Sequence, residues 1–145
     1  MPLEANKQLI RRMFAEDLNT KNREAGQLFF TADFIDHTNP PELQHGIDGH
    51  NRLVALLHAA FPDIHYTIDD IFAEADRVCV RVTLHGTHEG DFFGIPPTGK
   101  HVMVGGTHIL RIRDGKIAEH WGNNDDLSMM HQLGAMRDTV EPELR

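Results

Sequence analysis

His108 is the residue whose type and position most favour proton-transfer chemistry in this chain. It lies in a run of alternating polarity and shares one predicted strand face with Leu110 and Ile112, which should point into the core. A polar ring on such a face needs a hydrogen-bonding partner or a solvated cavity. We therefore interpret His108 as a candidate acid or base, with a hydrogen-bonded core histidine as the alternative.

The adjacent residues Asp36 and His37 place a carboxylate beside an imidazole. Histidine titrates near neutral pH and burial raises the pKa of a carboxyl group, so this pair is a second candidate for proton transfer. Adjacent strand residues point to opposite faces, so only one of the two can line a given pocket. The alternative is that both are exposed polar residues ahead of the break at Asn39-Pro40-Pro41.

An apolar loop separates two of the predicted strands and contains Phe92, Phe93, Ile95 and Pro96. Exposed apolar surface of this extent requires cover. We expect the loop either to close over a ligand or to pack against a partner chain. Trp121, on the last predicted strand, is either a core residue or an aromatic wall suited to a flat ring.

Metal ligation is the chemistry that the sequence supports least. His85, His88 and Glu89 form a superficial cluster, but the two histidines point to opposite faces of a straight strand. The chain also has no HExxH, no paired-cysteine zinc pattern, no P-loop, no GxGxxG and no GxSxG motif. We predict no bound metal and no organic cofactor, and a metal-dependent enzyme centred on these three residues is the alternative.

The N-terminal part of the chain has the periodicity of helices. Apolar spacing predicts a first helix near residues 4–19, a short second helix that Asn22 can cap, and a third that Asp48 can cap and Pro62 ends. Residues 31–37 have an extended pattern between the second and third helices.

After Pro62 the period changes to that of strands, predicted over residues 65–72, 77–85, 102–113 and 117–123. Asp114-Gly115 predicts a tight hairpin turn, and a last helix is expected with Asp125 or Asp126 as its cap and Gly134 after its end. Helices followed by antiparallel strands predict an α+β fold with a curved sheet against the helices.

Length and charge narrow the class of protein. The 145 residues fit one domain spanning 1–145, with a core over about 6–134 and a loose tail at 136–145. A net charge of −8 argues against binding nucleic acid or an anionic membrane, and no apolar run is long enough to span a bilayer. The lone Cys79 and the absence of secretory signal features favour a cytoplasmic location.

The succession of strand, aromatic loop, strand, Asp-Gly turn, strand and helix between Gly86 and Gly134 resembles the SnoaL-like polyketide (ester) cyclase family. This family belongs to the cone-shaped α+β folds named after nuclear transport factor 2, and the resemblance extends from about Asn6 to Gly134. It implies a curved mixed or antiparallel sheet wrapped around N-terminal helices, a short C-terminal helix, and a deep apolar pocket. We also expect a homodimer through the outer sheet face, because the outward residues of two predicted strands mix apolar and charged groups: Cys79, Arg81, Thr83 and His85, and Thr107, Ile109, Arg111 and Arg113.

The family reaction is an intramolecular aldol condensation by acid/base chemistry without a cofactor. The resemblance implies that His108 is a pocket histidine. The family has an Asn approximately at the position of Asp36. The family pattern His-x-Asp, whose Asp is the general acid/base, here reads His120-Trp121-Gly122. The acid/base carboxylate is therefore a glycine in this chain, which cannot move a proton.

We assign proton transfer to His108, His120 and Asp36. Contact with a small, flat, hydrophobic ligand is assigned to His37, Phe61, Phe92, Phe93, Trp121 and Asn124. The expected function is that of a SnoaL-like cyclase. Because Gly122 replaces the family carboxylate and one fold hosts many functions, a non-catalytic binding protein stays open, as does a hydrolase or isomerase that uses Asp36 as base.

Overall fold

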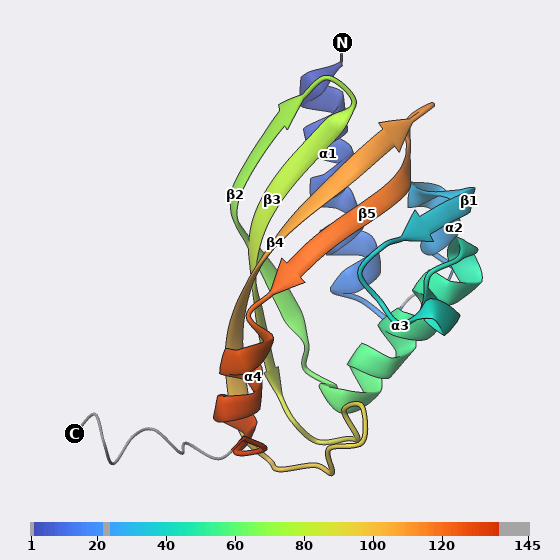
Figure 1. The fold of residues 1–145 in the computed structure, drawn as a ribbon. Helices are drawn as coiled ribbons and strands as arrows, with labels where there is room; N and C mark the ends of the chain where they lie inside the picture. The colour runs from blue at the N-terminus through green and yellow to red at the C-terminus, as the bar shows by residue number, and fades with distance from the viewer. Residues whose placement is uncertain (1, 22–23, 137–145) are drawn as a thin grey trace.

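A strongly curved sheet packs around the N-terminal helices in a computed structural model that describes residues 2–21 and 24–136 (Figure 1). The helical segments are α1 (Leu3–Met13), the π-helical η1 (Phe14–Leu18), α2 (Gly26–Phe29), the 3-10 turn η2 (Pro41–Leu43), α3 (Gly46–Ala60) and α4 (Asp126–Leu133). The strands are β1 (Phe30–Asp36), β2 (His65–Glu74), β3 (Arg77–Thr87), β4 (His101–Arg113) and β5 (Lys116–Asn124). The predicted α+β class is confirmed.

The five strands form one mixed sheet in the order β1-β5-β4-β3-β2. Strands β2 to β5 are antiparallel neighbours, whereas β1 pairs in parallel with β5. This parallel pairing joins the first strand of the chain to the last. Its register places Asp36 opposite His120.

The alternation predicted for β3 is confirmed. Val78, Val80 and Val82 are buried, whereas Arg81 on the other face is exposed. Because the strand period is two, the face opposite the core is left on the outside of the cone. His108 lies on the inner face of β4, in step with the buried Leu110.

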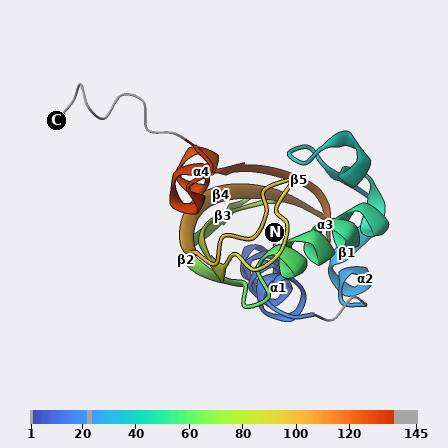
Figure 2. The ribbon, with the colours of Figure 1, turned by 90° about the horizontal axis from the view of Figure 1, so that it is seen from below.

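Three irregularities in strand register accompany the curvature of the sheet. They lie between Phe30 and Ile35 of β1, between Ile68 and Asp70 of β2, and between Arg111 and Ile112 of β4. Such irregularities bend strands and increase their twist. Viewed from below, the sheet follows an arc that α3 spans, with α1 against the inside (Figure 2).

The loop between β3 and β4 crosses the lower end of this cone (Figure 2). It is held against the end of α3, where the backbone N–H groups of Glu89 and Gly90 both donate to the Ala60 carbonyl. A Cβ atom at position 90 would lie 2.1 Å from the Ala59 carbonyl oxygen, so only glycine permits this approach.

Most predicted helix boundaries agree with the structure, and one cap is corrected. Helix α3 begins at Gly46, and no side chain caps it, so Asp48 lies within its first turn. Asp125 caps α4 by accepting a hydrogen bond from the Ser128 N–H, and Gly134 ends the helix with φ at 73°, as predicted. Asn22 and residues 137–145 lie outside the described residues.

Within the part of the chain that is described, no helix combines the length and apolarity needed to cross a membrane.

The extent of the first helix is close to the prediction, but its last turn is π-helical and contains the buried carboxylate of Asp17. Asp17 Oδ2 lies 2.5 Å from Nε2 of His50 on α3, which is also buried. The His50 ring packs against Phe30 and Phe34 of β1. This pair therefore ties η1 to α3 inside an otherwise apolar layer, and neither residue can lose its partner without leaving a buried polar group unpaired.

We predict that Asp17→Ala lowers the free energy of unfolding by about 3–5 kcal/mol, because it leaves His50 buried without its partner. Urea denaturation gives this quantity. Glu16→Ala is the matched control, since Glu16 is its exposed neighbour and its side chain pairs with Arg12 on the surface. Equal losses for the two variants would contradict the structural role of the Asp17–His50 pair.

Candidate active site

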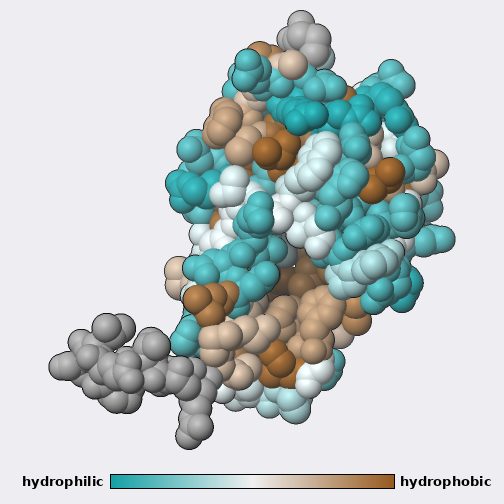
Figure 3. All heavy atoms as spheres, viewed as in Figure 1, coloured by the Kyte–Doolittle hydropathy of each residue, from teal (hydrophilic) through white to brown (hydrophobic). Residues whose placement is uncertain are grey.

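A cavity of about 420 Å³ occupies the interior of the cone. Its walls come from every layer of the fold and are mainly apolar, including Met13, Phe14, Leu18, Phe34, Leu53, Leu57, Val82, Leu84, Val104, Leu110, Met129 and Met130. Figure 3 shows the molecular surface hollowed between α3 and α4, with apolar residues inside and below the hollow and polar residues on either side of it. A cavity of this size and lining suits a small hydrophobic molecule.

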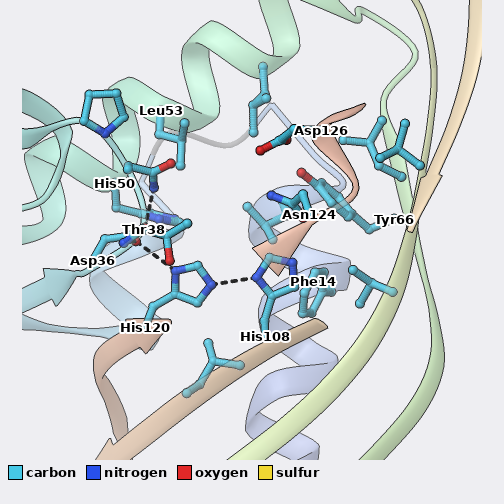
Figure 4. Close-up of a pocket in the computed structure, with 18 of the residues that line it drawn as sticks. Phe14, Asp36, Thr38, His50, Leu53, Tyr66, His108, His120, Asn124 and Asp126 are labelled. Carbon is cyan, nitrogen blue, oxygen red and sulfur yellow. Dashed lines mark hydrogen bonds and ion pairs between the residues drawn. The ribbon is translucent and has the colours of Figure 1, made fainter. Parts of the chain in front are cut away.

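One wall of the cavity is polar, and its side chains form a continuous chain of contacts (Figure 4). Asp36 Oδ1 lies 3.0 Å from His120 Nδ1. His120 Nε2 lies 2.7 Å from His108 Nδ1, and the two rings are nearly parallel with centroids 5.0 Å apart. Three residues that were predicted to transfer protons are thus brought together.

Strand pairing explains this arrangement. In β5, His120, Gly122 and Asn124 share the inward face because alternate residues point the same way. The register sets His120 beside Asp36 on one side, while Gly122 lies opposite His108 of β4 on the other. The two imidazoles therefore meet diagonally across neighbouring strands.

The carboxylate of Asp36 is almost completely buried but fully hydrogen-bonded. Besides His120, its oxygens accept from the backbone N–H of Thr38 at 3.0 Å and from Asn39 Nδ2 at 2.5 Å. Burial by itself raises the pKa of Asp36, but the hydrogen bonds that its carboxylate accepts from His120, Thr38 and Asn39 hold that pKa below its ordinary value. Asp36 is therefore ionised at neutral pH.

His108 has the opposite electrostatic environment. Burial lowers its pKa to about 4, and the neighbouring His120 acts in the same direction. A hydrogen bond with the Asn124 side chain and the charge of Asp36 offset part of this shift. His108 is therefore neutral at pH 7 and has a nitrogen able to accept a proton.

Gly122 supplies the space in which the two rings meet. A Cβ atom at this position would lie 2.3 Å from His108 Nδ1 and 2.9 Å from His120 Nε2. These distances are below van der Waals contact, so a side chain at position 122 is incompatible with the observed contact between the histidines.

Three of the predicted ligand-binding residues do not line the cavity. His37 and Trp121 stack on each other at 4.8 Å outside it, and Arg77 lies over the Trp121 ring. Their positions follow from strand parity, since each is adjacent to a residue that points inward. Phe61 is buried behind Phe92, with ring centroids 5.4 Å apart, and supports that residue from the core.

The other predicted contacts, Phe92, Phe93 and Asn124, do line the cavity. Phe92 and Phe93 come from the loop at the lower end of the cone, and their rings meet edge to face. Asn124 reaches the cavity in the regular register of β5, opposite Gly106.

Sequence reasoning missed several polar lining residues: Thr38, Asn39, His50, Tyr66 and Asp126. For His50 a signal was present, because positions 50, 54 and 58 of α3 fall on one helical stripe, and all three are buried. Tyr66 was placed on a strand, but its face depends on pairing with β3. Only a folded chain shows that Thr38 and Asn39 surround Asp36.

The charged lining of the cavity is acidic. The carboxylates of Asp36 and Asp126 contribute to it, and among the described residues no lysine or arginine does. The described residues also contain no group of three His, Cys, Asp or Glu side chains arranged to hold a metal. His88 is buried with its Nδ1 bonded to Thr98, and His85 contacts Thr67, so the absence of metal stays a prediction that elemental analysis can test.

Comparison with known proteins identifies relatives along most of the chain. The family described as SnoaL-like polyketide cyclase matches residues 8–133. The chain is 33% identical to aklanonic acid methyl ester cyclase DnrD of Streptomyces peucetius over 142 residues, which cover 92% of this chain and 93% of that protein. It is 31% identical to nogalonic acid methyl ester cyclase of Streptomyces nogalater over 105 residues, 68% of this chain and 78% of that one.

Among solved structures, TsrD from Streptomyces laurentii has a TM-score of 0.86 and is 27% identical. The match covers 94% of this chain and 99% of TsrD.

We predict that the pKa of His108 makes stability depend on pH. Between about 6.5, the ordinary value, and about 4, the unfolded chain binds a proton that the folded chain does not. The free energy of unfolding should therefore fall as the pH drops through this window, by up to about 3 kcal/mol from this residue. The difference in unfolding free energy between wild type and His108→Asn, measured from pH 7 to 4, should shrink accordingly. A constant difference would contradict the depressed pKa.

Proposed function

This chain belongs to the SnoaL-like polyketide cyclase family, and from that premise we propose that it is an enzyme that closes a ring in a small, flat, hydrophobic, polyketide-like substrate. The supporting observation is the chain of polar groups from Asp36 through His120 to His108 on one wall of an otherwise apolar cavity. A purely passive apolar pocket would gain nothing from burying these groups. The arrangement favours catalysis over ligand storage.

The proposed reaction is an intramolecular aldol condensation. His108 takes a proton from a carbon next to a carbonyl group and so produces an enolate. The enolate carbon attacks a second carbonyl carbon of the same molecule, and the resulting alkoxide takes a proton back. No other reactant is consumed, so the chemistry needs only a base, a donor for the developing oxyanion and a cavity that orients the chain.

The charges of the lining support a substrate without a free carboxylate. With Asp36 and Asp126 in the wall and no cation among the described lining residues, a carboxylate substrate would lose its hydration without gaining a counter-charge. An ester of the same acid avoids this cost. The names of the relatives from Streptomyces peucetius and Streptomyces nogalater, both methyl ester cyclases, agree with this proposal.

The apolar walls support a flat substrate. Phe14 and Tyr66 meet edge to face on one side, and Phe92 and Phe93 form a second aromatic surface at the lower end of the cone. Aromatic side chains stack on planar rings and exclude water from the reacting atoms. The proposed enzyme needs no metal or organic cofactor, and we place it in the cytoplasm because the lone Cys79 provides no internal disulfide.

We expect purified protein to cyclise aklanonic acid methyl ester or nogalonic acid methyl ester, and to act on the free acid of the same compound much more slowly. His108→Asn keeps the approximate size and a hydrogen-bonding group but cannot titrate near neutrality. Its turnover should fall about 10²- to 10⁴-fold with KM little changed.

Product formation followed by liquid chromatography tests this prediction. His65→Asn is the control, since His65 lies at the exposed start of β2 and does not line the cavity. Tight binding of the ester without any turnover would instead support a binding protein.

We also propose a homodimer formed by the outer face of the sheet. Phe72, Cys79, Ile109 and Trp121 are successive register partners across β2, β3, β4 and β5, so they form one apolar row. Phe72 is 59% exposed and Ile109 38%. Three pairs of charged register partners flank this row: Arg77 with Glu74, Arg81 with Asp70, and Arg111 with Glu119. Such a mixture of apolar centre and charged edge is typical of a protein interface.

The dimer predicts a molecular mass of twice 16.4 kDa by light scattering at micromolar concentration. Ile109→Arg places a charge in the centre of the apolar row and should give a monomer. Leu28→Arg is the control, because Leu28 is an exposed apolar residue on α2 that lies away from this face. A monomeric wild type would rule out the proposed dimer.

A further inference from the structure

We propose that His108, His120 and Asp36 act as a directional proton relay, and that Gly122 is the residue that makes this relay possible. The inference rests on the proposed function, in which His108 exchanges a proton with the substrate. It adds the route by which the accompanying positive charge leaves His108, and it assigns His120, Asp36 and Gly122 as positioning residues.

The hydrogen bonds set the direction of the relay. Asp36 is ionised and only accepts, so His120 Nδ1 carries the hydrogen that joins them. The relay assigns the neutral form to resting His120, whose bare Nε2 can only accept, so the contact of 2.7 Å then places a hydrogen on His108 Nδ1. The lone pair of His108 is then on Nε2, on the ring edge away from His120, and the Asn124 side-chain oxygen beside it accepts the hydrogen that Nε2 gains.

Each step balances without a further reactant. His108 Nε2 takes the proton from the substrate carbon while Nδ1 passes its own proton to His120 Nε2. His108 stays neutral, His120 becomes an imidazolium, and the substrate becomes an enolate. After the carbon–carbon bond forms, the alkoxide takes the proton from His108 Nε2, and His120 returns a proton to Nδ1.

The relay solves a problem set by burial. A lone imidazole with a pKa of about 4 is a poor base at neutral pH, because its cation is poorly solvated in the cavity wall. Transfer to His120 places the positive charge 3.0 Å from the ionised Asp36. The carboxylate stabilises that imidazolium without becoming protonated.

Two glycines make the space on either side of the His108 ring. A Cβ at Gly122 would lie 2.3 Å from Nδ1, on the relay side, and a Cβ at Gly106 would lie 2.3 Å from Asn124 Oδ1 and 3.1 Å from Nε2, on the other side. Gly105, the neighbour of Gly106 on β4, has nothing within 4 Å of its Cβ position. Three glycine-to-alanine changes therefore test the relay. Gly122→Ala blocks the relay side, Gly106→Ala blocks the Nε2 side, and Gly105→Ala is the matched control.

Gly122→Ala should lower kcat about 10²-fold, because it separates two rings that must stay in hydrogen-bond contact, with KM changed little. Gly105→Ala should keep the wild-type kcat within about twofold, as expected of a surface change. Gly106→Ala obstructs the Nε2 side and should raise KM as well as lower kcat. Wild-type turnover in Gly122→Ala would overturn the relay.

Asp36→Asn tests the relay without changing the space around the rings. It removes the carboxylate that stabilises protonated His120 and so lowers the pKa of that imidazole. The acidic limb of the pH profile of kcat/KM should therefore move to lower pH, and kcat should fall. The other titratable side chains that line the cavity are His50 on α3, Tyr66 on β2 and Asp126 at the start of α4. They are present in both the wild type and Asp36→Asn, so they do not account for a difference between the two pH profiles. An unchanged acidic limb would mean that Asp36 is only structural.

Nitrogen-15 NMR of the histidine rings provides a readout that needs no substrate. At pH 7 both His108 and His120 should be the Nδ1–H tautomer in the wild type, with assignments from His108→Asn and His120→Asn. Gly122→Ala should abolish the effect of His120 titration on the His108 ring, and Gly105→Ala should retain it. A neutral His108 with its hydrogen on Nε2 would overturn the relay even if the protein is a cyclase. The expected tautomers in a protein without cyclase activity would instead refute the proposed function alone.

Discussion

The contact between the buried carboxylate of Asp36 and the ring of His120 is the interaction on which the rest of the site depends. A charge in the wall of an apolar cone is tolerated only if its oxygens are satisfied, and the Thr38 N–H, Asn39 and His120 together do this. Meeting that requirement fixes the β1 end, the loop that follows it and β5 in one arrangement. The parallel pairing of β1 with β5 is what makes the contact available.

Two differences from the family pattern, at Gly122 and at Asp36, are related to each other in the structure. The family has a carboxylate on the last strand, where this chain has Gly122, and an amide approximately where this chain has Asp36. Here the carboxylate lies on β1, on the Nδ1 side of His120, and the vacated position lets His108 contact Nε2. The loss at one position and the gain at the other therefore preserve a carboxylate next to an imidazole to which we assign proton transfer.

Different residues of the cavity provide substrate contact and acid/base groups. Apolar side chains from the helices, the sheet and the β3–β4 loop provide the contact area, whereas Asp36, His108 and His120 lie on the strands β1, β4 and β5. Strands hold side chains more rigidly than loops, and groups that exchange protons need fixed separations. The Asp17–His50 pair adds a second buried polar contact, which fixes the helical wall opposite the sheet.

The periodicity of the sequence determined most of the elements and the inward direction of His108, because apolar spacing is a local property of a helix or strand. It also established that only one of Asp36 and His37 enters the pocket. Tertiary structure alone decided that this is Asp36, and that Trp121 lies outside. Strand order and register are set by contacts between distant segments, so the meeting of Asp36 with His120, and the need for a glycine at position 122, exist only in the folded chain.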